Sequence, residues 1–462
     1  MRWRRALPFA IVAVLMLTYF TSNYLFVEDL VKQDLGYISD EVWYVSASRN
    51  MLREFWGLKP NAEVEGKTYA TVVVWLPQYY NETYRWLVEV AGLQAIVKDD
   101  YASGSLRDGW DGGFAVLASK EILEEAASNP NVEVYFGYPY PDHPGIINYL
   151  NFEHPPLAKY VIAGVMLLSD NPIAWKIPSL ILGSAIILLA YLVARKVFGA
   201  IEGIIASVFI FTEQTVKAMS MVAMLDIYLA FLTLLALYLA VRFKNVWPST
   251  LTVGLAASAK MSGAFAIPAL LALSVKKGFL KRLPAIILAP IAVYTLASTP
   301  VILYFGGVWK WINNVRSAVG WYTTPRPSGP PTATPIEFLF GGASFPLSFN
   351  PPLSASPNIA LTLLVIPLTV LLLPLAIKGV LKGAGAILAW FWSTYFGYVA
   401  VYLAGNTTLY AFYAVQFMPI AAIIGSSIVT FILRHELLIK ALRAYVEPFR
   451  RKPRLEAEFQ PS

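Results

Sequence analysis

Long apolar runs separated by short basic turns make up most of this chain. The first run, over 6–27, follows a basic start, and the sequence beyond residue 171 is apolar almost to its end. A helix needs about 20 apolar residues to cross a bilayer. We expect the first run to be a retained helix and not a signal peptide, because it has no small-residue cleavage pattern. The later candidate spans are 173–194, 200–218, 226–241, 247–259, 264–275, 283–304, 359–377, 384–404 and 409–433.

A polar stretch over 28–171 interrupts this pattern after the first run. Within it, three short segments favour strands and two favour helices, which predicts a small α/β insertion at about residues 60–140. The expected strands are 69–76, 113–118 and 132–136, and the expected helices are 82–96 and 120–128. Residues 155–169 are apolar but too few to span, so we expect them to re-enter or to lie on the outer surface.

Composition and charge agree with a membrane protein. Of the 462 residues, 57% are apolar and 14% are charged, whereas a soluble domain has about 25% charged residues. The net charge is +7, and basic residues gather at the N-terminus and after every second span, which indicates cytoplasmic turns and not a nucleic-acid surface. The basic turns are Arg195 with Lys196, Arg242 with Lys244, Lys276 and Lys277 with Lys281 and Arg282, Lys378 with Lys382, and Arg434 onward.

These patterns predict an all-α multi-pass membrane protein with about ten transmembrane helices and an α/β insertion in its first outer loop. The expected segments are a first helix over 1–27, an outer loop over 28–171, helices over 172–304, a second outer loop over 305–358, helices over 359–433 and a basic cytoplasmic tail over 434–462. Functional groups in the two loops would then lie outside the cytoplasm.

Two acidic features are candidates for chemistry. Asp40 and Glu41 follow the first helix, and a carboxylate at the outer interface can act as general base on a hydroxyl. The alternative is a solvated acidic pair. Asp226 begins an apolar run, where an acidic side chain is costly and is a functional candidate. Its alternative is a helix N-cap at the membrane boundary, and the two roles are compatible.

Four cationic or titratable residues are candidates for binding a phosphate or an acceptor. His154 and Lys159 flank two prolines in the string Glu-His-Pro-Pro-Leu-Ala-Lys, which predicts a sharp helix start near the interface. Lys260 and Lys176 also fall on the predicted outer side, where a lysine can face a lipid phosphate as a point charge. The alternative for each lysine is a helix-end side chain that snorkels to the interface.

Other chemistries find little support in the sequence. There is no cysteine, which excludes disulfides, thiolate metal sites and cysteine nucleophiles. The three histidines are His143, His154 and His435, too few for a histidine-rich metal site. No phosphate-binding loop and no dinucleotide fingerprint occurs. We therefore predict no cofactor and no metal site.

Taken in order, these motifs resemble the protein O-mannosyltransferase family, within the C-type glycosyltransferase superfamily. The Asp40-Glu41 pair is similar to the acidic pair of the family's first outer loop, and the string over 153–159 is similar to its His-Pro-Pro-Leu-x-Lys motif. Shorter similarities lie at 175–183, 225–226, 259–263 and 412–419.

The resemblance implies a C-type glycosyltransferase fold and transfer of a sugar, typically mannose, from a dolichyl or other polyprenyl phosphate to a Ser or Thr hydroxyl with inversion. It implies Asp40 as the base and Glu41 as an acceptor-binding or supporting group. It implies His154, Lys159 and Lys260 as contacts to the carrier phosphate or the acceptor. No nucleotide sugar and no obligatory divalent metal is implied.

The sequence departs from the family pattern at two points. Lys176 stands where an arginine is common, and lysine cannot make a bidentate clamp on phosphate. The extra mass lies in the first outer loop, because residues 305–358 are too few for the late-loop domain of eukaryotic members. The acceptor can therefore differ from the family's usual one.

Other functions stay open. Transfer of the sugar to a lipid or an envelope glycan would use the same donor. A transporter or flippase would favour inverted repeats and broken helices, and the sequence shows no such symmetry. An oligosaccharyltransferase is disfavoured, since no string resembles Trp-Trp-Asp-Tyr-Gly. The partners that we expect are a lipid-linked sugar donor, a protein or lipid acceptor and membrane lipids, but no nucleic acid.

Overall fold

The computed structural model describes residues 2–34, 36–92, 96–97, 112–141, 145–275, 278–324 and 330–447. Several features of the sequence fall outside these residues. They are His143, the basic pair Lys276 and Lys277, part of the proline-rich segment near 325–329 and the tail beyond residue 447.

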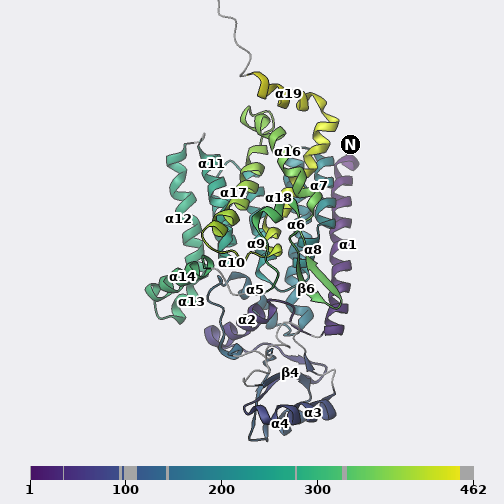
Figure 1. Ribbon diagram of the computed structural model, residues 1–462, viewed down its shortest axis with the longest axis vertical. Coiled ribbons are helices and arrows are strands. Elements are labelled where there is room, and N and C mark those ends of the chain that lie inside the picture. The colour runs from purple at the N-terminus through teal and green to yellow at the C-terminus, as the bar shows by residue number, and fades with distance from the viewer. Residues whose placement is uncertain are drawn as a thin grey trace, which may run out of the picture.

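A bundle of helices forms the body of the molecule, and most of them run along its long axis (Figure 1). The bundle opens with α1 (Arg2–Asp34), which contains the first predicted span. Two 3-10 helices, η4 (Met261–Ala266) and η5 (Ala411–Gln416), lead into α11 and α18. The other bundle helices are α6 (Pro172–Val197), α7 (Ala200–Thr212), α8 (Gln214–Ser220), α9 (Leu225–Arg242), α10 (Trp247–Ala259), α11 (Ile267–Ser274), α12 (Phe279–Ala297), α16 (Ile359–Ile377), α17 (Ala384–Leu403) and α18 (Met418–Leu433).

Six helices of the described chain are long and apolar enough to cross a membrane, namely α1, α6, α9, α12, α16 and α17. A seventh span results if α18 and α19 (His435–Val446), which meet at 104°, are counted together. The remaining predicted spans are shorter helices. The run over 200–218 is broken at Glu213, whose carboxylate caps α8 by accepting from the backbone N–H of Val216. The chain is therefore an integral, multi-pass membrane protein.

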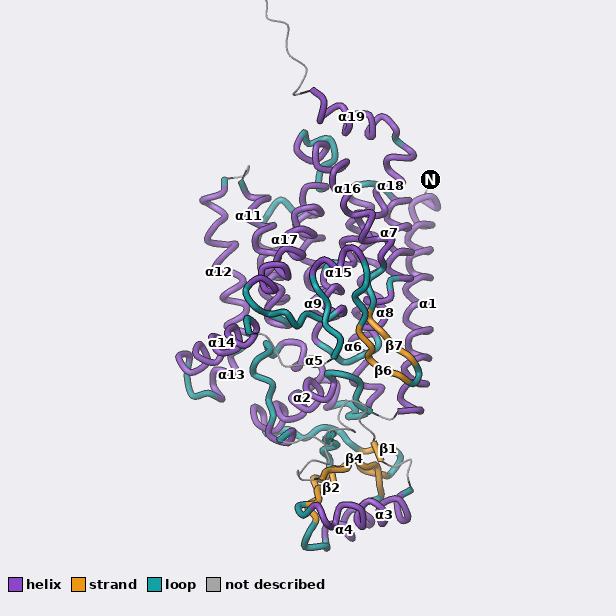
Figure 2. The backbone as a smooth tube through the Cα atoms, in the orientation of Figure 1, coloured by secondary structure: helices purple, strands orange, loops and turns teal. Residues whose placement is uncertain are grey.

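The α/β insertion is present at one end of the bundle. Its central strand is β2 (Lys67–Val74), which pairs antiparallel with β1 (Glu63–Val64), β4 (Gly112–Ala118) and β5 (Val132–Phe136). A short β3 (Ile96–Val97) pairs with β4. The helices α3 (Tyr80–Ala91) and α4 (Lys120–Ala127) lie together on one side of the sheet (Figure 2).

A separate small core holds the insertion together. Ala70, Val72 and Val74 alternate along β2 and pack with Leu87 of α3 and Leu123 of α4, all of them fully buried. Thr71 and Val73, on the other face of the strand, are buried as well, so the centre of β2 is covered on both faces. The predicted helix over 82–96 ends earlier, at Ala91, because the next residue is Gly92 with φ +82°.

The remaining described elements are shorter than the long bundle helices. They are α2 (Glu41–Trp56), η1 (Pro77–Tyr79), η3 (Ile146–Asn148), α5 (Leu157–Met166), α13 (Thr299–Tyr304), α14 (Val308–Tyr322), α15 (Pro335–Phe340), β6 (Phe345–Phe349) and β7 (Pro352–Ala355). The predicted second outer loop thus contains two helices and a hairpin. The N-terminus and α19 lie at one end of the bundle, and α2, α13, α14 and the insertion lie at the other (Figure 1).

Candidate active site

The acidic pair begins α2, where the bundle meets the insertion. Ser39 adopts a left-handed backbone with φ +54°, so the chain turns sharply before Asp40. Asp40 is partly exposed, whereas Glu41 is fully buried. The structure therefore gives these two adjacent carboxylates different environments, which the sequence does not distinguish.

Glu41 forms a buried junction between three parts of the chain. Its Oε2 lies 2.7 Å from Nζ of Lys176 in α6 and accepts from the backbone N–H of Ile38 at 2.9 Å. Its Oε1 accepts from the backbone N–H of Ala223, just before α9, at 2.5 Å. Neither charged side chain is exposed. Glu41 and Lys176 therefore hold the start of α2 in place.

Asp226 and Lys260 form a second ion pair. The Nζ of Lys260 lies 2.6 Å from Oδ1 of Asp226, and their side chains are 8% and 0% exposed. Asp226 lies in the first turn of α9, and Lys260 directly follows the last turn of α10. Each charge thus has the sign that the dipole of its own helix favours. The ammonium also lies 4.1 Å from the ring centroid of Tyr413, a cation–π contact.

Lys260 lines a cavity of about 220 Å³ whose walls are mostly apolar and aromatic. Tyr322, Tyr398 and Tyr413 contribute hydroxyl-bearing rings to these walls. The other lining residues are Met261, Ser262, Phe265, Val319, Thr323, Val401, Asn406 and Leu409. One cation in an apolar chamber provides a binding place for an anionic group that is attached to a hydrophobic chain.

His154 lies between two tyrosines that come from distant segments. The hydroxyl of Tyr322 lies 2.5 Å from Nδ1 of His154, and the hydroxyl of Tyr44 lies 3.4 Å from its Nε2. Both tyrosine rings pack edge-on against the imidazole, with centroids 5.5 and 5.4 Å away. Tyr322 also lines the cavity that contains Lys260, so His154 lies next to this cavity.

Tyr44 connects the acidic motif with the rest of the site. Burial raises the pKa of Tyr44 well above its usual value, and the charges of Asp40 and Asp226 add to the rise, as do Tyr322 and Tyr413. The hydroxyl therefore stays protonated and lies within electrostatic reach of both carboxylates. The sequence analysis missed Tyr44. Its spacing of four residues after Asp40 is the signal, because residues i and i+4 share a face of a helix.

Lys159 holds the loop that carries His154. Its fully buried ammonium donates to the backbone carbonyl of His154 at 3.0 Å and to the side-chain carbonyl of Asn151 at 3.2 Å. It also donates to the backbone carbonyl of Asn151, a residue with φ +51°. Burial lowers the pKa of Lys159 to about 7, and nearby Glu153 opposes this shift. The geometry supports a positioning role for Lys159 and not contact with a carrier phosphate.

A buried network at the other side of α2 was also missed from sequence. Arg49 makes a bidentate pair with Asp170, at 2.7 Å from Nε and 2.8 Å from Nη2. The indole N–H of Trp175 donates to the same carboxylate at 2.6 Å. The network joins α2 to the segment that begins α6, so α2 is fixed on two sides. Bidentate arginine–carboxylate geometry is among the stronger polar contacts in proteins.

The sequence profile of the dolichyl-phosphate-mannose-protein mannosyltransferase family matches residues 153–305. This match confirms the family resemblance. The matched segment contains five of the seven predicted site residues and leaves out Asp40 and Glu41. No curated protein sequence matches the chain.

Solved structures show the fold more completely. The apo oligosaccharyltransferase of Archaeoglobus fulgidus is 12% identical, with a TM-score of 0.50, over 96% of this chain and 52% of its own. ArnT of Cupriavidus metallidurans bound to undecaprenyl phosphate is 13% identical, with a TM-score of 0.47, over 94% of this chain and 63% of its own. The chain thus spans about half to two thirds of these proteins. The likeness to the oligosaccharyltransferase shows the C-type glycosyltransferase fold that we predicted.

Proposed function

We propose that this protein is a membrane glycosyltransferase that moves a sugar, mannose by family resemblance, from a polyprenyl phosphate to a Ser or Thr hydroxyl of a protein outside the cytoplasm. The observation that carries the proposal is the grouping around Tyr44. Tyr44 lies one helical turn after the partly exposed Asp40 and contacts His154. His154 also contacts Tyr322, which lines the apolar cavity together with Lys260.

The donor side of the reaction needs a positive charge next to the leaving phosphate. Lys260 provides it from the cavity wall, and the Asp226 pair fixes its ammonium in place. The aromatic and apolar walls would take the sugar ring and the first part of the polyprenyl chain. A preorganised cation in a site that excludes much water stabilises charge that develops on the leaving oxygen.

The acceptor side needs a base. Asp40 would take the proton of the acceptor hydroxyl while the oxygen attacks the anomeric carbon. The new carbon–oxygen bond forms as the bond to the phosphate oxygen breaks, and the polyprenyl phosphate leaves with the bonding electrons. A single displacement of this kind inverts the anomeric carbon. His154, held by Tyr44 and Tyr322, is placed to orient the acceptor.

One observation supports a protein acceptor: the profile of a protein mannosyltransferase family covers the segment that contains His154 and Lys260. Transfer to a lipid or an envelope glycan would use the same donor site. The acceptor experiment below therefore includes both classes.

The test uses purified protein in detergent, radiolabelled polyprenyl-phosphate mannose, and either a Ser/Thr peptide or a lipid extract as acceptor. The variants are Asp40→Asn and, as a matched control, Glu54→Gln, which removes an exposed carboxylate from the other end of α2. We expect Asp40→Asn to lower turnover by about 10²–10⁴-fold, the usual contribution of a positioned base. Glu54→Gln should leave turnover unchanged.

Each outcome decides between the candidate functions. Label on the peptide with wild type, and little with Asp40→Asn, supports both the protein acceptor and the base. Label on lipid alone would mean that the protein is a glycosyltransferase whose acceptor is a lipid and not a protein. No transfer from any carrier sugar by a folded protein would overturn the proposal in favour of a transporter. Normal turnover in a folded Asp40→Asn variant would show that Asp40 is not the general base.

A further inference from the structure

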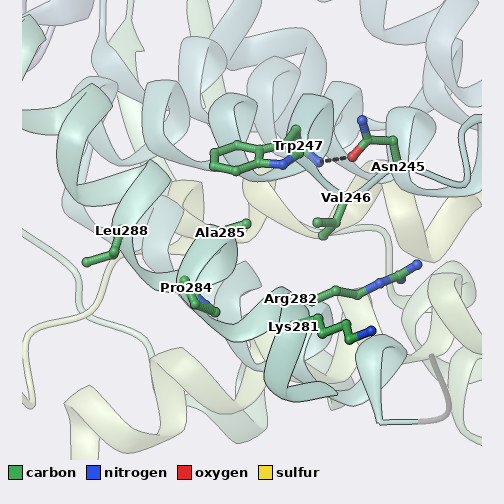
Figure 3. A pocket seen from close by; sticks show the side chains of 8 residues that line it. All are labelled: Asn245, Val246, Trp247, Lys281, Arg282, Pro284, Ala285 and Leu288. Atoms are coloured by element: carbon green, nitrogen blue, oxygen red, sulfur yellow. Dashed lines mark hydrogen bonds between the residues drawn. The ribbon is translucent and has the colours of Figure 1, made fainter. Parts of the chain in front are cut away.

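A second cavity, of about 270 Å³, lies between the turn that joins α9 to α10 and the first turns of α12 (Figure 3). Its walls are Asn245, Val246, Trp247, Lys281, Arg282, Pro284, Ala285 and Leu288. Trp247 is the first residue of α10, and Lys260 follows its last residue. At a rise of about 1.5 Å per residue, the two cavities lie about 20 Å apart along α10. This cavity is therefore separate from the candidate active site.

One face of α12 supplies half of the cavity wall. Lys281, Pro284, Ala285 and Leu288 follow the spacing i, i+3, i+4 and i+7, so they lie in one row along the helix. The row is charged at its start and apolar at its end. It covers about 10 Å, from the rise of an α-helix. A phospholipid has the same order over a similar length, with a charged headgroup followed by acyl chains.

The electrostatics of the cavity favour an anion. Lys281 and Arg282 both line it, and none of the eight lining residues is acidic. Among the residues that the structure describes, neither cation takes part in an ion pair. Arg282 is held by a long hydrogen bond from Nη2 to the backbone carbonyl of Lys244, at 3.5 Å. Arginine binds phosphate in a fixed planar geometry, and lysine binds it as a point charge.

The surroundings favour a lipid over a free anion. The helix α12 is one of the six long apolar spans, and most of its apolar stretch faces outward. Leu288, at the apolar end of the row, is 61% exposed on this long apolar helix, as a side chain in contact with lipid would be. Trp247 is half-exposed at the rim, a common place for tryptophan at the interface between membrane and water.

We propose that this cavity binds the phosphate headgroup of an anionic phospholipid. Lys281 and Arg282 contact the phosphate, Trp247 packs on the glycerol region, and an acyl chain follows the row from Pro284 to Leu288. Basic pockets between membrane helices are a known way to recognise such headgroups. The site lies on the membrane-facing surface and requires no change in the fold.

Native mass spectrometry of the purified full-length protein provides the test, because it counts bound lipids one by one. Phosphatidylglycerol and phosphatidylcholine are the lipid probes, and inorganic phosphate and glycerol phosphate are the soluble ones. The test variant is Lys281→Gln with Arg282→Gln. The matched control is Lys310→Gln with Arg316→Gln, which removes the same charges from exposed positions on α14. A third variant, Trp247→Ala, keeps both cations.

We expect wild type to hold one phosphatidylglycerol at least about tenfold more tightly than the test variant, from the loss of two headgroup contacts. The control should match wild type, and Trp247→Ala should weaken lipid binding and leave phosphate binding unchanged.

Equal binding by wild type and the test variant overturns the site. An equal loss in the control assigns the binding to general surface charge. If soluble phosphate displaces the lipid at equal concentration, the site is a free-anion site and the lipid assignment is wrong. If the test variant does not fold, an unchanged lipid affinity in Trp247→Ala overturns the proposal by itself.

Discussion

The ammonium of Lys176 lies 2.7 Å from the carboxylate of Glu41, and both side chains are fully buried. Asp40, one residue earlier, is partly exposed. The two residues of the acidic pair therefore have different environments, which the sequence does not distinguish. Glu41 fixes the start of α2 against α6 and the segment before α9, and Asp40 is left at the surface of the site. This division makes different predictions for the two carboxylates.

Glu41→Gln should destabilise the protein. The substitution leaves the Lys176 charge buried without its partner, and breaking a buried pair in this way costs about 3–5 kcal/mol. We expect a lower midpoint of thermal unfolding in detergent and a loss of activity that follows the loss of folded protein. Adding Lys176→Met to Glu41→Gln should recover part of the stability, because it removes the buried charge.

Two results would contradict this role for Glu41. One is a Glu41→Gln variant as stable as wild type. The other is a stable Glu41→Gln variant with normal donor binding and no turnover, which would make Glu41 a group that acts on the reacting atoms.

Lys260→Gln should weaken donor binding and slow the transfer. The variant keeps a side chain of similar length and loses the charge next to the cavity, so the leaving phosphate is less stabilised. It also leaves Asp226 buried without its partner, which lowers stability, so turnover is compared per amount of folded protein. A charge-assisted contact of about 1.5–3 kcal/mol corresponds to a loss of about 10- to 100-fold. The measurement is turnover against donor concentration, compared with Lys310→Gln, which removes an exposed lysine from α14. Equal kinetics for the two variants would show that Lys260 does not contact the leaving phosphate.

Much of the fold follows from local sequence patterns. The apolar runs identify the bundle helices because helix formation in a membrane depends on the composition of one continuous segment. The insertion follows from the succession of short strand and helix segments along the polar stretch. The apolar runs do not show where a helix breaks within a run. The run over 200–218 is interrupted at Glu213, whose capping of α8 depends on backbone geometry. The run over 283–304 is similarly divided between α12 and α13.

The candidate site is less accessible to sequence reasoning, because its contacts are long-range. Glu41 and Lys176 are 135 residues apart, and His154 and Tyr322 are 168 residues apart. Motifs indicated the residue types but not their partners. The lysines show this most clearly. All three that were predicted to contact a phosphate lie against buried protein partners, and of these Lys260 also lines a cavity.

Tyr322→Phe should lower activity modestly and leave the fold intact. The phenol contacts Nδ1 of His154, and its loss frees the imidazole to turn. We expect turnover to fall about 2- to 10-fold, the equivalent of a hydrogen bond of about 0.5–1.5 kcal/mol. Tyr304→Phe is the control, because Tyr304 packs by its ring against Phe152 and Phe55 at the outer surface. A Tyr322→Phe variant with wild-type kinetics would show that the contact with His154 has no part in the reaction.

Lys159→Met should destabilise the loop before α5. The ammonium satisfies the backbone carbonyls of Asn151 and His154 in a fully buried position. Methionine has similar volume but no donor, and each carbonyl left without a partner costs about 1–3 kcal/mol. Thermal unfolding of Lys159→Met, compared with Lys310→Met, measures the effect. If Lys159→Met unfolds at the same temperature as wild type but binds the donor poorly, then Lys159 contacts the carrier phosphate as the motif first suggested.

The sidedness of the membrane can be tested independently of the chemistry. The chain has no cysteine, so Glu133→Cys in β5 and Lys440→Cys in α19 each introduce a single thiol at an exposed position. The basic turns predict that the insertion lies outside and α19 inside the cytoplasm. A membrane-impermeant maleimide should therefore label residue 133 on intact cells and residue 440 only after the membrane is opened. The reverse pattern would place Asp40 and the Lys260 cavity on the cytoplasmic side. Transfer to secreted proteins would then be impossible, even if every active-site substitution behaved as expected.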